Sequence, residues 1–212
     1  MKTYYAEKYN IDPKDMVVVC VMPCTAKKTE ILRDHQNAAG VPDVDIVLTT
    51  REFARLVKSR GIDFRGLPDE SFDSPIGEGS TAGLIFGATG GVMEAALRTA
   101  AHMLDGSFEV LDFFAVRGAN PIKEATYLVA GHTLRVAVAS GLENAVTLLE
   151  EIKSGEKHYD FIEIMACPGG CVNGGGQPTL SDSVRNSTEL KETRAKALYM
   201  SDSLIDQRRS SD

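Results

Sequence analysis

The most informative absences in this 212-residue chain are those of long apolar segments and of basic clusters. No run approaches the ~20 apolar residues that a membrane-spanning helix requires, and no signal-peptide pattern occurs. The formal net charge of −7, without any basic run, argues against a nucleic-acid-binding surface. We therefore expect a cytoplasmic protein whose partners are neither nucleic acids nor membranes.

Cysteine is also scarce, with only four residues, at positions 20, 24, 167 and 171. In a chain without a secretory signal, these cysteines favour metal or redox chemistry over a disulfide framework. Apolar residues make up 43% of the chain and charged residues 25%, which is ordinary for a globular protein. The length allows one good core or two small lobes.

Strand-like and helix-like segments alternate along the chain. Residues 16–22 form a continuous apolar, β-branched run, which is typical of a strand buried on both faces. Thr49 and Glu52 form a capping box that begins a helix ending near Arg60. The remaining strands are predicted at 45–50, 109–116, 124–130, 133–140 and 159–165, and further helices at 92–104 and 142–153.

This alternation predicts an α/β fold, with two lobes of mostly parallel sheets flanked by helices and cofactor loops at strand ends. A polar, helical C-terminal tail follows Pro178. The chain opens on a helix-like segment at 3–9 and finishes on a charged helical pattern at 204–212 without a glycine C-cap. We therefore expect residues 1–212 to be part of one domain of a longer polypeptide, truncated at both ends.

The segment 161–178 carries the strongest functional signal. An apolar strand ends at Cys167, and Cys171 follows across Pro168-Gly169-Gly170. Five glycines fall within the eight residues 169–176, and glycine loses the most entropy when a loop becomes ordered. Such a loop is tolerable where backbone must approach a bulky group, so the segment predicts a cofactor site.

Three interpretations of the cysteines compete. Burial as small apolar side chains suits Cys20, which lies within an apolar strand. A structural zinc site built from two Cys-x₃-Cys pairs is disfavoured, because zinc ribbons use shorter, knuckle-like spacings. An iron–sulfur cubane needs thiolates from several loops, and Cys24, Cys167 and Cys171 supply three. Its fourth ligand is then either Cys20 or a cysteine outside this chain.

Two motifs closely resemble signature motifs of the iron-only (FeFe) hydrogenases. They are Met-Pro-Cys-Thr-Ala-Lys-Lys-Thr-Glu at 22–30 and Glu-Ile-Met-Ala-Cys-Pro-Gly-Gly-Cys-Val-Asn-Gly-Gly-Gly-Gln-Pro at 163–178. The segment Ile-Phe-Gly-Ala-Thr-Gly-Gly-Val-Met-Glu-Ala-Ala-Leu-Arg at 85–98 is similar to this family as well, and the resemblance covers nearly the whole chain. The family's first motif, Thr-Ser-Cys-Cys-Pro with a following tryptophan, is absent, and the chain contains no tryptophan.

The resemblance implies reversible interconversion of H₂ with protons and electrons at an H-cluster. This cofactor is a 4Fe-4S cubane bridged to a two-iron unit that carries CO, cyanide and azadithiolate ligands. Carried over by position, the motifs imply the following roles: cubane ligands at Cys24 and Cys167, a bridging thiolate at Cys171, a cyanide hydrogen bond from Lys27, packing against the two-iron unit by Met22 and Met165, and a pocket lining of Phe86 and Gly87. Glu30 is either the ion-pair partner of Lys27 or a surface acid.

The missing first motif carries the family's fourth cubane ligand and proton-relay cysteine, so we expect this chain alone to be inactive. Cys20 does not match a family ligand. The implied partners are H₂ and protons, maturation proteins, and an electron carrier such as ferredoxin or NAD(P)-linked subunits. Two alternatives are a non-catalytic iron–sulfur relative, acting as a sensor or in cluster assembly, and a structural zinc module.

Overall fold

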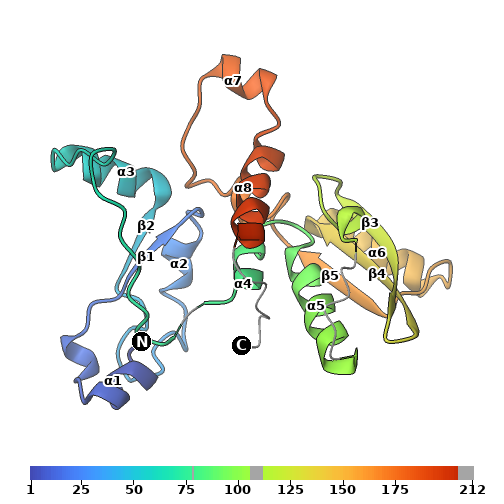
Figure 1. Ribbon diagram of the computed structural model, residues 1–212, viewed down its shortest axis with the longest axis horizontal. Coiled ribbons are helices and arrows are strands. Elements are labelled where there is room, and N and C mark those ends of the chain that lie inside the picture. Colours follow the sequence, from blue (N-terminus) through green and yellow to red (C-terminus); the bar gives the residue numbers. More distant parts are fainter. Residues whose placement is uncertain (78, 106–111, 205–212) are drawn as a thin grey trace. The chain divides into compact units, whose positions relative to one another are not determined.

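The computed structural model describes residues 1–77, 79–105 and 112–204 (Figure 1). The chain divides into two compact units. The first contains the residues up to 78 together with Gly174–Leu180, and the second contains Gly79–Asn173 and the residues from Ser181 onward. This division agrees with the two lobes predicted from the sequence.

The first unit is built on a pair of parallel strands, β1 (Val19–Met22) and β2 (Ile46–Thr49), in which Cys20 lies opposite Val47. Strand β2 runs directly into helix α3 (Thr50–Ser59) through the predicted capping box. The unit also contains the short helices α1 (Tyr4–Tyr9), η1 (Pro13–Asp15) and α2 (Lys27–Glu30).

The prediction of a first strand over 16–22, buried on both faces, is wrong in two respects. Strand β1 includes only residues 19–22, and its side chains alternate between exposed and half-buried. Val19 is 49% and Val21 46% exposed. Within the described residues this sheet has two strands and one covered face, so its strands alternate as in a half-buried sheet. Cys20 lies on the covered face and is half-buried.

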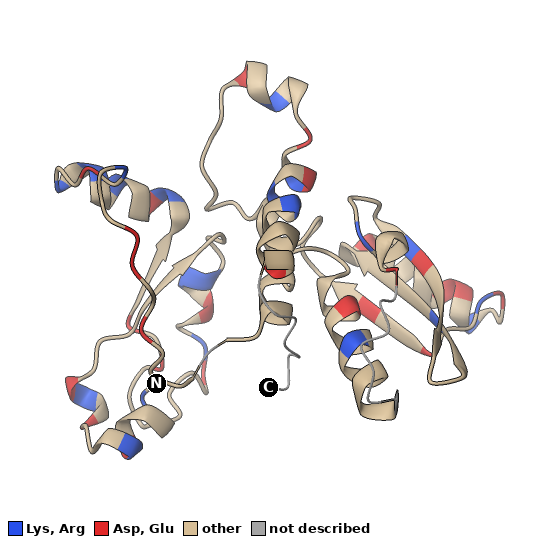
Figure 2. Cartoon of the chain, viewed as in Figure 1, with Lys and Arg blue, Asp and Glu red and all other residues tan. Residues whose placement is uncertain are grey.

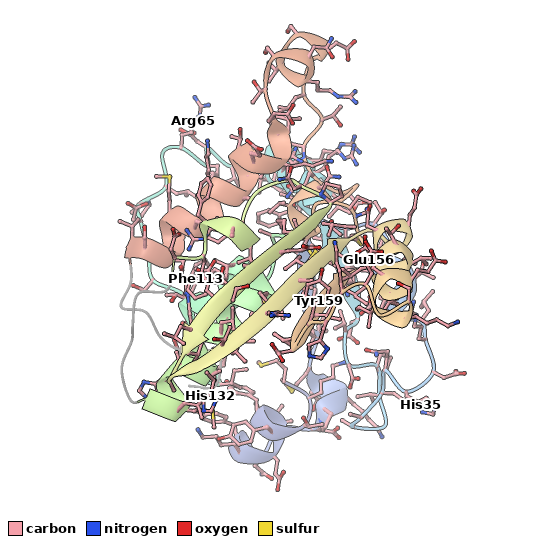
Figure 3. All side chains as sticks on the ribbon, turned by 90° about the vertical axis from the view of Figure 1, so that its right-hand side faces the viewer. His35, Arg65, Phe113, His132, Glu156 and Tyr159 are labelled. Carbon is pink, nitrogen blue, oxygen red and sulfur yellow. The ribbon has the colours of Figure 1, made fainter. Side chains whose placement is uncertain are left out.

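The second unit contains a three-stranded sheet in the order β3-β4-β5. Strands β3 (Ile122–Val129) and β4 (His132–Ser140) form an antiparallel hairpin, whose turn lies beside His132 in Figure 3. Strand β5 (Phe161–Met165) pairs with β4 in parallel. The described parts of the chain therefore form one parallel pair of strands and one mixed sheet.

Strand β4 is the centre of the core, because helices cover both faces of its sheet. Val136 and Val138 pack on one face with residues of α5 (Gly91–Asp105), whereas Ala137 and Ala139 pack on the other with residues of α6 (Leu142–Lys153). All four strand residues have 0% exposure. The layers of this unit are visible on the right of Figure 1.

One predicted strand is replaced by a helical turn. Of the predicted strand at 109–116, residues 109–111 lie outside the described residues, and Phe114–Val116 form the 3₁₀ helix η2. Asp112 accepts a hydrogen bond from the Phe114 N–H at 2.9 Å, which favours a turn over an extended chain. Phe113 and Val116 are buried, and Phe113 lies near the hairpin, its ring 5.6 Å from that of Tyr127 (Figure 3).

The remaining helices of the second unit are α4 (Thr81–Ile85), η3 (Cys171–Asn173), α7 (Asp182–Ser187) and α8 (Leu190–Leu204). Helices α7 and α8 confirm the predicted helical tail, whereas the pattern after Leu204 lies outside the described residues. Acidic and basic residues are interspersed along the elements (Figure 2). Among the residues described, no helix is long and apolar enough to cross a membrane.

A buried ion-pair network joins three segments of the second unit. Glu94 of α5 is fully buried and binds Arg117 at 2.8 and 2.6 Å and also contacts Arg98. Arg98 in turn binds both carboxylate oxygens of Asp202 at 2.9 and 2.7 Å. The network therefore attaches the end of α8 to α5 and to the segment after η2.

Candidate cofactor site

The first cysteine motif begins where β1 ends. Cys24 is half-buried and follows Pro23, whose carbonyl accepts a hydrogen bond from the Gly176 N–H at 2.8 Å. Met22, the last residue of β1, is also half-buried. Because β1 and β2 are parallel, their carboxyl ends lie at the same edge, where ligand-binding residues of α/β sheets gather.

Lys27, at the start of α2, is paired with Glu30. Its ammonium lies 2.8 and 2.6 Å from the two carboxylate oxygens, and this hydrogen bond lowers the pKa of Glu30. Both side chains are substantially exposed, so water screens the pair and it contributes little to stability. The ammonium has three N–H donors, so this weak pair leaves it free to bind an additional anionic acceptor.

The second cysteine motif follows β5 in the second unit. Met165 ends the strand half-buried, and Cys167 and Cys171 are exposed free thiols on the loop that follows. The loop is held by its own backbone, since the Gly170 N–H donates to the Cys167 carbonyl at 3.0 Å. The Asn173 side chain also donates to the Pro168 carbonyl at 3.1 Å.

The loop after α4 packs against this cysteine loop. The Val172 N–H donates to the Gly87 carbonyl at 3.0 Å, and Phe86 beside it is 40% exposed. A Cβ atom added to Gly170 would lie 2.7 Å from the Gly87 oxygen and 3.0 Å from the Thr89 nitrogen. The second unit therefore brings Phe86 and Gly87 against the loop that carries both exposed thiols.

The glycine-rich run continues into the first unit from Gly174. Gly176 donates to Pro23 and accepts from the Arg51 N–H at 3.0 Å, and an added Cβ would lie 2.7 Å from the side chain of Thr49. At Gly170 and Gly176 the close neighbour is therefore the protein itself. These two glycines are therefore needed for packing within the protein, whatever the loop binds.

The structure separates the predicted site residues into two groups. Met22, Cys24 and Lys27 belong to the first unit, whereas Phe86, Gly87, Met165, Cys167 and Cys171 belong to the second. Within the described ranges, no three His, Cys, Asp or Glu side chains gather as a set that could hold a single metal ion. Each motif presents free cysteine after the end of a strand, and cysteine thiolates are the ligands of iron–sulfur clusters.

Sequence reasoning missed two buried ionisable residues behind this site. Glu163 of β5 accepts hydrogen bonds from the N–H groups of Gly90 and Met93 at 2.8 and 2.7 Å, so its carboxylate caps the N-terminus of α5. Lys123 of β3 donates to the Thr89 carbonyl at 2.9 Å and to the Gly118 carbonyl at 3.2 Å. For Glu163 the available signal was an acidic residue inside an apolar strand, whereas Lys123 lies outside the strand predicted at 124–130 and had no such signal.

Lys123 makes protein stability depend on pH in the alkaline range. Burial lowers the pKa of Lys123 to about 8, against an opposing effect of Glu163. Between that pH and the ordinary lysine pKa near ~10.4, the unfolded chain binds more protons than the folded one, so the free energy of unfolding gains a term that rises with pH. We expect this term to reach on the order of 2 kcal/mol from pH 8 to pH 10.

Urea unfolding of the wild type and of Lys123→Met across this pH range measures the term. As the pH rises, the free energy of unfolding of the wild type should increase relative to that of Lys123→Met. Parallel pH profiles of the two proteins would show that the folded-state pKa of Lys123 is not lowered.

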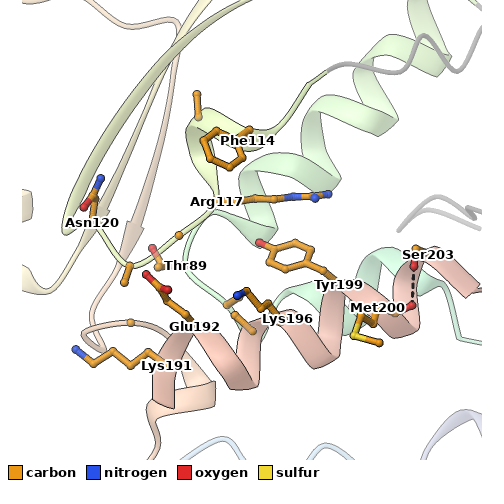
Figure 4. Close-up of a pocket in the computed structure, with 16 residues that line it drawn as sticks. Thr89, Phe114, Arg117, Asn120, Lys191, Glu192, Lys196, Tyr199, Met200 and Ser203 are labelled. Carbon is orange, nitrogen blue, oxygen red and sulfur yellow. Dashed lines mark hydrogen bonds between the residues drawn. The ribbon is translucent and has the colours of Figure 1, made fainter. Parts of the chain in front are cut away.

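A cavity of about 860 Å³ borders the cysteine loop within the second unit. Figure 4 shows it between α8 and the segment after η2, with the Arg117 guanidinium 4.3 Å from the centre of the Tyr199 ring. Gly169 of the cysteine loop lines the cavity, and Lys191 and Lys196 of α8 lie along it. An added Cβ on Gly169 would lie 3.0 Å from the Lys191 side chain, so this lysine packs over the loop.

The chain matches the family described as "Iron only hydrogenase large subunit, C-terminal domain" over residues 1–175. It is 50% identical over 202 residues to the NADP-reducing hydrogenase subunit HndD of Solidesulfovibrio fructosivorans, which covers 95% of this chain and 34% of the relative. A solved FeFe-hydrogenase variant from Chlamydomonas reinhardtii matches with a TM-score of 0.74 and 42% identity, over 99% of this chain and 59% of that structure.

Relatives that are not named as hydrogenases have lower sequence identity to this chain. Protein NAR1 of Arabidopsis thaliana is 33% identical over 204 residues, which covers 88% of this chain and 42% of that protein. The chain spans between about a third and a half of the length of the curated hydrogenases it matches.

Proposed function

The chain belongs to the iron-only hydrogenase large-subunit family, and from that membership we propose that it forms part of an H₂-converting site. The reaction is the reversible reduction of protons to H₂ at an H-cluster, made of a 4Fe-4S cubane and a two-iron unit with CO, cyanide and azadithiolate ligands. The observation that carries the proposal is the exposed thiol pair Cys167 and Cys171, held on one loop against Phe86 and Gly87.

The proposal gives each motif residue a separate task. Cys24 and Cys167 would hold the cubane, and Cys171 would hold both the cubane and the two-iron unit. When bound, the cofactor supplies the redox chemistry and the open iron position, and the protein supplies its orientation and surroundings. Met22 and Met165, half-buried at the ends of their strands, contribute soft apolar surface that excludes water. Phe86 and Gly87 line the same pocket.

Lys27 would bind the anionic side of the cofactor. Its ammonium is a compact charge on a flexible stem, and its exposed pair with Glu30 is weak enough to share it with a cyanide ligand. Lysine at this position, together with both methionines, favours a hydrogenase over a cluster-assembly or sensor protein, because such relatives usually lose parts of these surroundings. The 50% identity to a hydrogenase subunit, against 33% to NAR1, supports the same choice.

The electron carrier and the compartment follow less directly from the family. HndD is named as an NADP-reducing subunit, which supports an NAD(P)-linked electron partner for this protein, with ferredoxin as the alternative. Maturation proteins that supply the two-iron unit belong to the same proposal. The cytoplasmic location stays a prediction.

Substitution of Lys27 tests the proposed function. We expect Lys27→Ala to lower H₂ evolution from a reduced dye about 100-fold, which is the typical effect of removing one charge-stabilising donor from an active site. The EPR signal of the reduced cubane should persist, because Lys27 is not a ligand. H₂ evolution is measured on an anaerobically matured hydrogenase that contains this chain together with the first cysteine motif, because we expect the chain alone to be inactive.

Lys28 is the matched control, since its ammonium pairs with Glu52 at 2.9 Å and with the Val47 carbonyl at 3.2 Å. Lys28→Ala should keep H₂ evolution within about threefold of the wild type, as expected for loss of an exposed pair. Equal H₂ evolution by the Lys27→Ala and Lys28→Ala enzymes would count against the proposal.

A further inference from the structure

We propose that Ser140 is a positioning residue for the loop that carries Cys167 and Cys171, and that its hydroxyl sets how this loop presents its thiolates. The inference rests on the proposed function, because those thiolates are taken to hold an iron–sulfur cubane. No motif of the sequence points to Ser140, which is simply the last residue of strand β4.

The strand register places Ser140 directly under the loop. Ser140 lies opposite Met165 in the parallel β4–β5 pair, and Cys167 follows two residues later. The next residue after Ser140 also binds this strand, since the Gly141 N–H donates to the Met165 carbonyl at 2.7 Å. The end of β4 is therefore attached to the strand from which the cysteine loop emerges.

The backbone of Ser140 is fixed on its other sides too. Its N–H donates to the Pro121 carbonyl at 2.7 Å, and its own carbonyl accepts from the Asn144 side chain at 2.7 Å. Ser140 is only 3% exposed. These contacts satisfy the backbone groups of Ser140 outside the cysteine loop and leave its hydroxyl for other partners.

The hydroxyl of Ser140 binds the cysteine loop at two points. It accepts a hydrogen bond from the Gly169 N–H at 2.7 Å and donates to the Cys167 carbonyl at 3.4 Å. A serine hydroxyl has one donor and two acceptor positions, so it bridges both groups at once. Gly169 has a φ of +80°, and this bridge holds it in that conformation between the two thiols.

Burial of a hydroxyl after four fully buried apolar residues requires a reason. The residues before Ser140 in β4 are Val136, Ala137, Val138 and Ala139, all with 0% exposure. A hydroxyl buried in such a place is unfavourable unless it is hydrogen-bonded. Its two partners here both belong to the cysteine loop, which indicates that Ser140 serves that loop.

The bridge also controls where the Gly169 N–H points. While it donates to Ser140, this N–H is not available to the sulfur atoms of a cluster. Hydrogen bonds to cluster sulfurs are among the factors that set the reduction potential of iron–sulfur clusters. Loss of the hydroxyl releases the Gly169 N–H, so the potential is expected to change together with cluster retention.

Ser140→Ala, Ser140→Thr and the control Asn144→Ala test the proposal on the anaerobically reconstituted protein. The readouts are the rate of iron release to a ferrous chelator and the midpoint potential of the cubane from an EPR redox titration. We expect Ser140→Ala to release iron about tenfold faster, the factor that corresponds to one lost hydrogen bond of about 1.4 kcal/mol. Ser140→Thr, which keeps a hydroxyl, should restore both readouts.

Asn144→Ala removes a hydrogen bond from the same turn without touching the cysteine loop. It should leave the midpoint potential unchanged and the iron-release rate within about threefold of the wild type, because the lost hydrogen bond ends at the Ser140 carbonyl and the Ser140 hydroxyl keeps both of its partners in the cysteine loop. Wild-type behaviour of Ser140→Ala, or equal changes in the alanine variants at 140 and 144, would overturn the role of Ser140. A wild-type protein that binds no cluster would instead refute the proposed function.

Discussion

Replacing Glu94 by alanine is expected to lower the free energy of unfolding by about 3–5 kcal/mol, the cost of removing one partner from a buried ion pair. The Glu94 carboxylate has 0% exposure and neutralises Arg98, whose side chain is only 8% exposed, together with Arg117. Without Glu94, the positive charges of Arg98 and Arg117 lose their shared carboxylate, and Asp202 neutralises only Arg98. Urea unfolding of the purified protein measures the loss.

Two further variants separate this network from a simple loss of packing. Glu150→Ala, on the exposed face of α6, should change the free energy of unfolding by less than about 0.5 kcal/mol. Glu94 and Asp202 share Arg98, so the combined variant should differ from the sum of the single variants by at least ~0.5 kcal/mol. Additive effects, or a small effect of Glu94→Ala, would mean that the network contributes little.

The second large effect is expected at Gly170. We expect Gly170→Ala to cost about 3 kcal/mol or more of stability and to abolish cluster binding. Gly170 has a φ of +87°, which is strained for alanine, and the added Cβ would lie 2.7 Å from the Gly87 oxygen. The atoms nearest to the added Cβ are all backbone atoms of residues 87–89. The clash can therefore be relieved only if this segment and the cysteine loop move apart.

Two other glycines provide a graded control. Gly155 has a similar φ of +80° with nothing within 4 Å of an added Cβ, so Gly155→Ala should cost only the conformational strain, about 1 kcal/mol. Gly169 has the same φ as Gly155, but an added Cβ would lie 3.0 Å from the flexible Lys191 side chain. The stability cost of Gly169→Ala should therefore lie between those of Gly155→Ala and Gly170→Ala. Equal costs at Gly155 and Gly170 would show that the close approach to Gly87 does not matter.

Features determined by local sequence were predicted from the sequence. The capping box of Thr49 and Glu52 needs only a hydroxyl and a carboxylate three residues apart, and the structure contains it with both hydrogen bonds. The apolar strand β4 and the loops that carry Cys24 and Cys167 follow equally from short patterns. The comparisons confirm the family that these patterns indicated.

Features determined by distant partners were not predicted. The exposed face of β1 depends on how many strands the sheet contains, which the apolar run of residues 16–22 does not encode. The turn at Phe114 depends on the hydrogen bond that the Phe114 N–H donates to Asp112, and on burial of Phe113 and Val116 against distant β3. The Ser140 hydroxyl acquires its partners only when the loop after β5 folds against the end of β4, so a single-sequence pattern contains no signal for its role.

Anaerobic reconstitution with iron and sulfide, followed by metal analysis and EPR, tests the central claim most directly. The proposed ligands predict a reducible cubane in the wild type that survives Cys20→Ala and is lost in Cys24→Ala, Cys167→Ala and Cys171→Ala. Cys20 is the matched control, because it is a half-buried thiol on β1, four residues before Cys24. A cubane that disappears with Cys20→Ala, or tightly bound zinc without any cluster, would contradict the account.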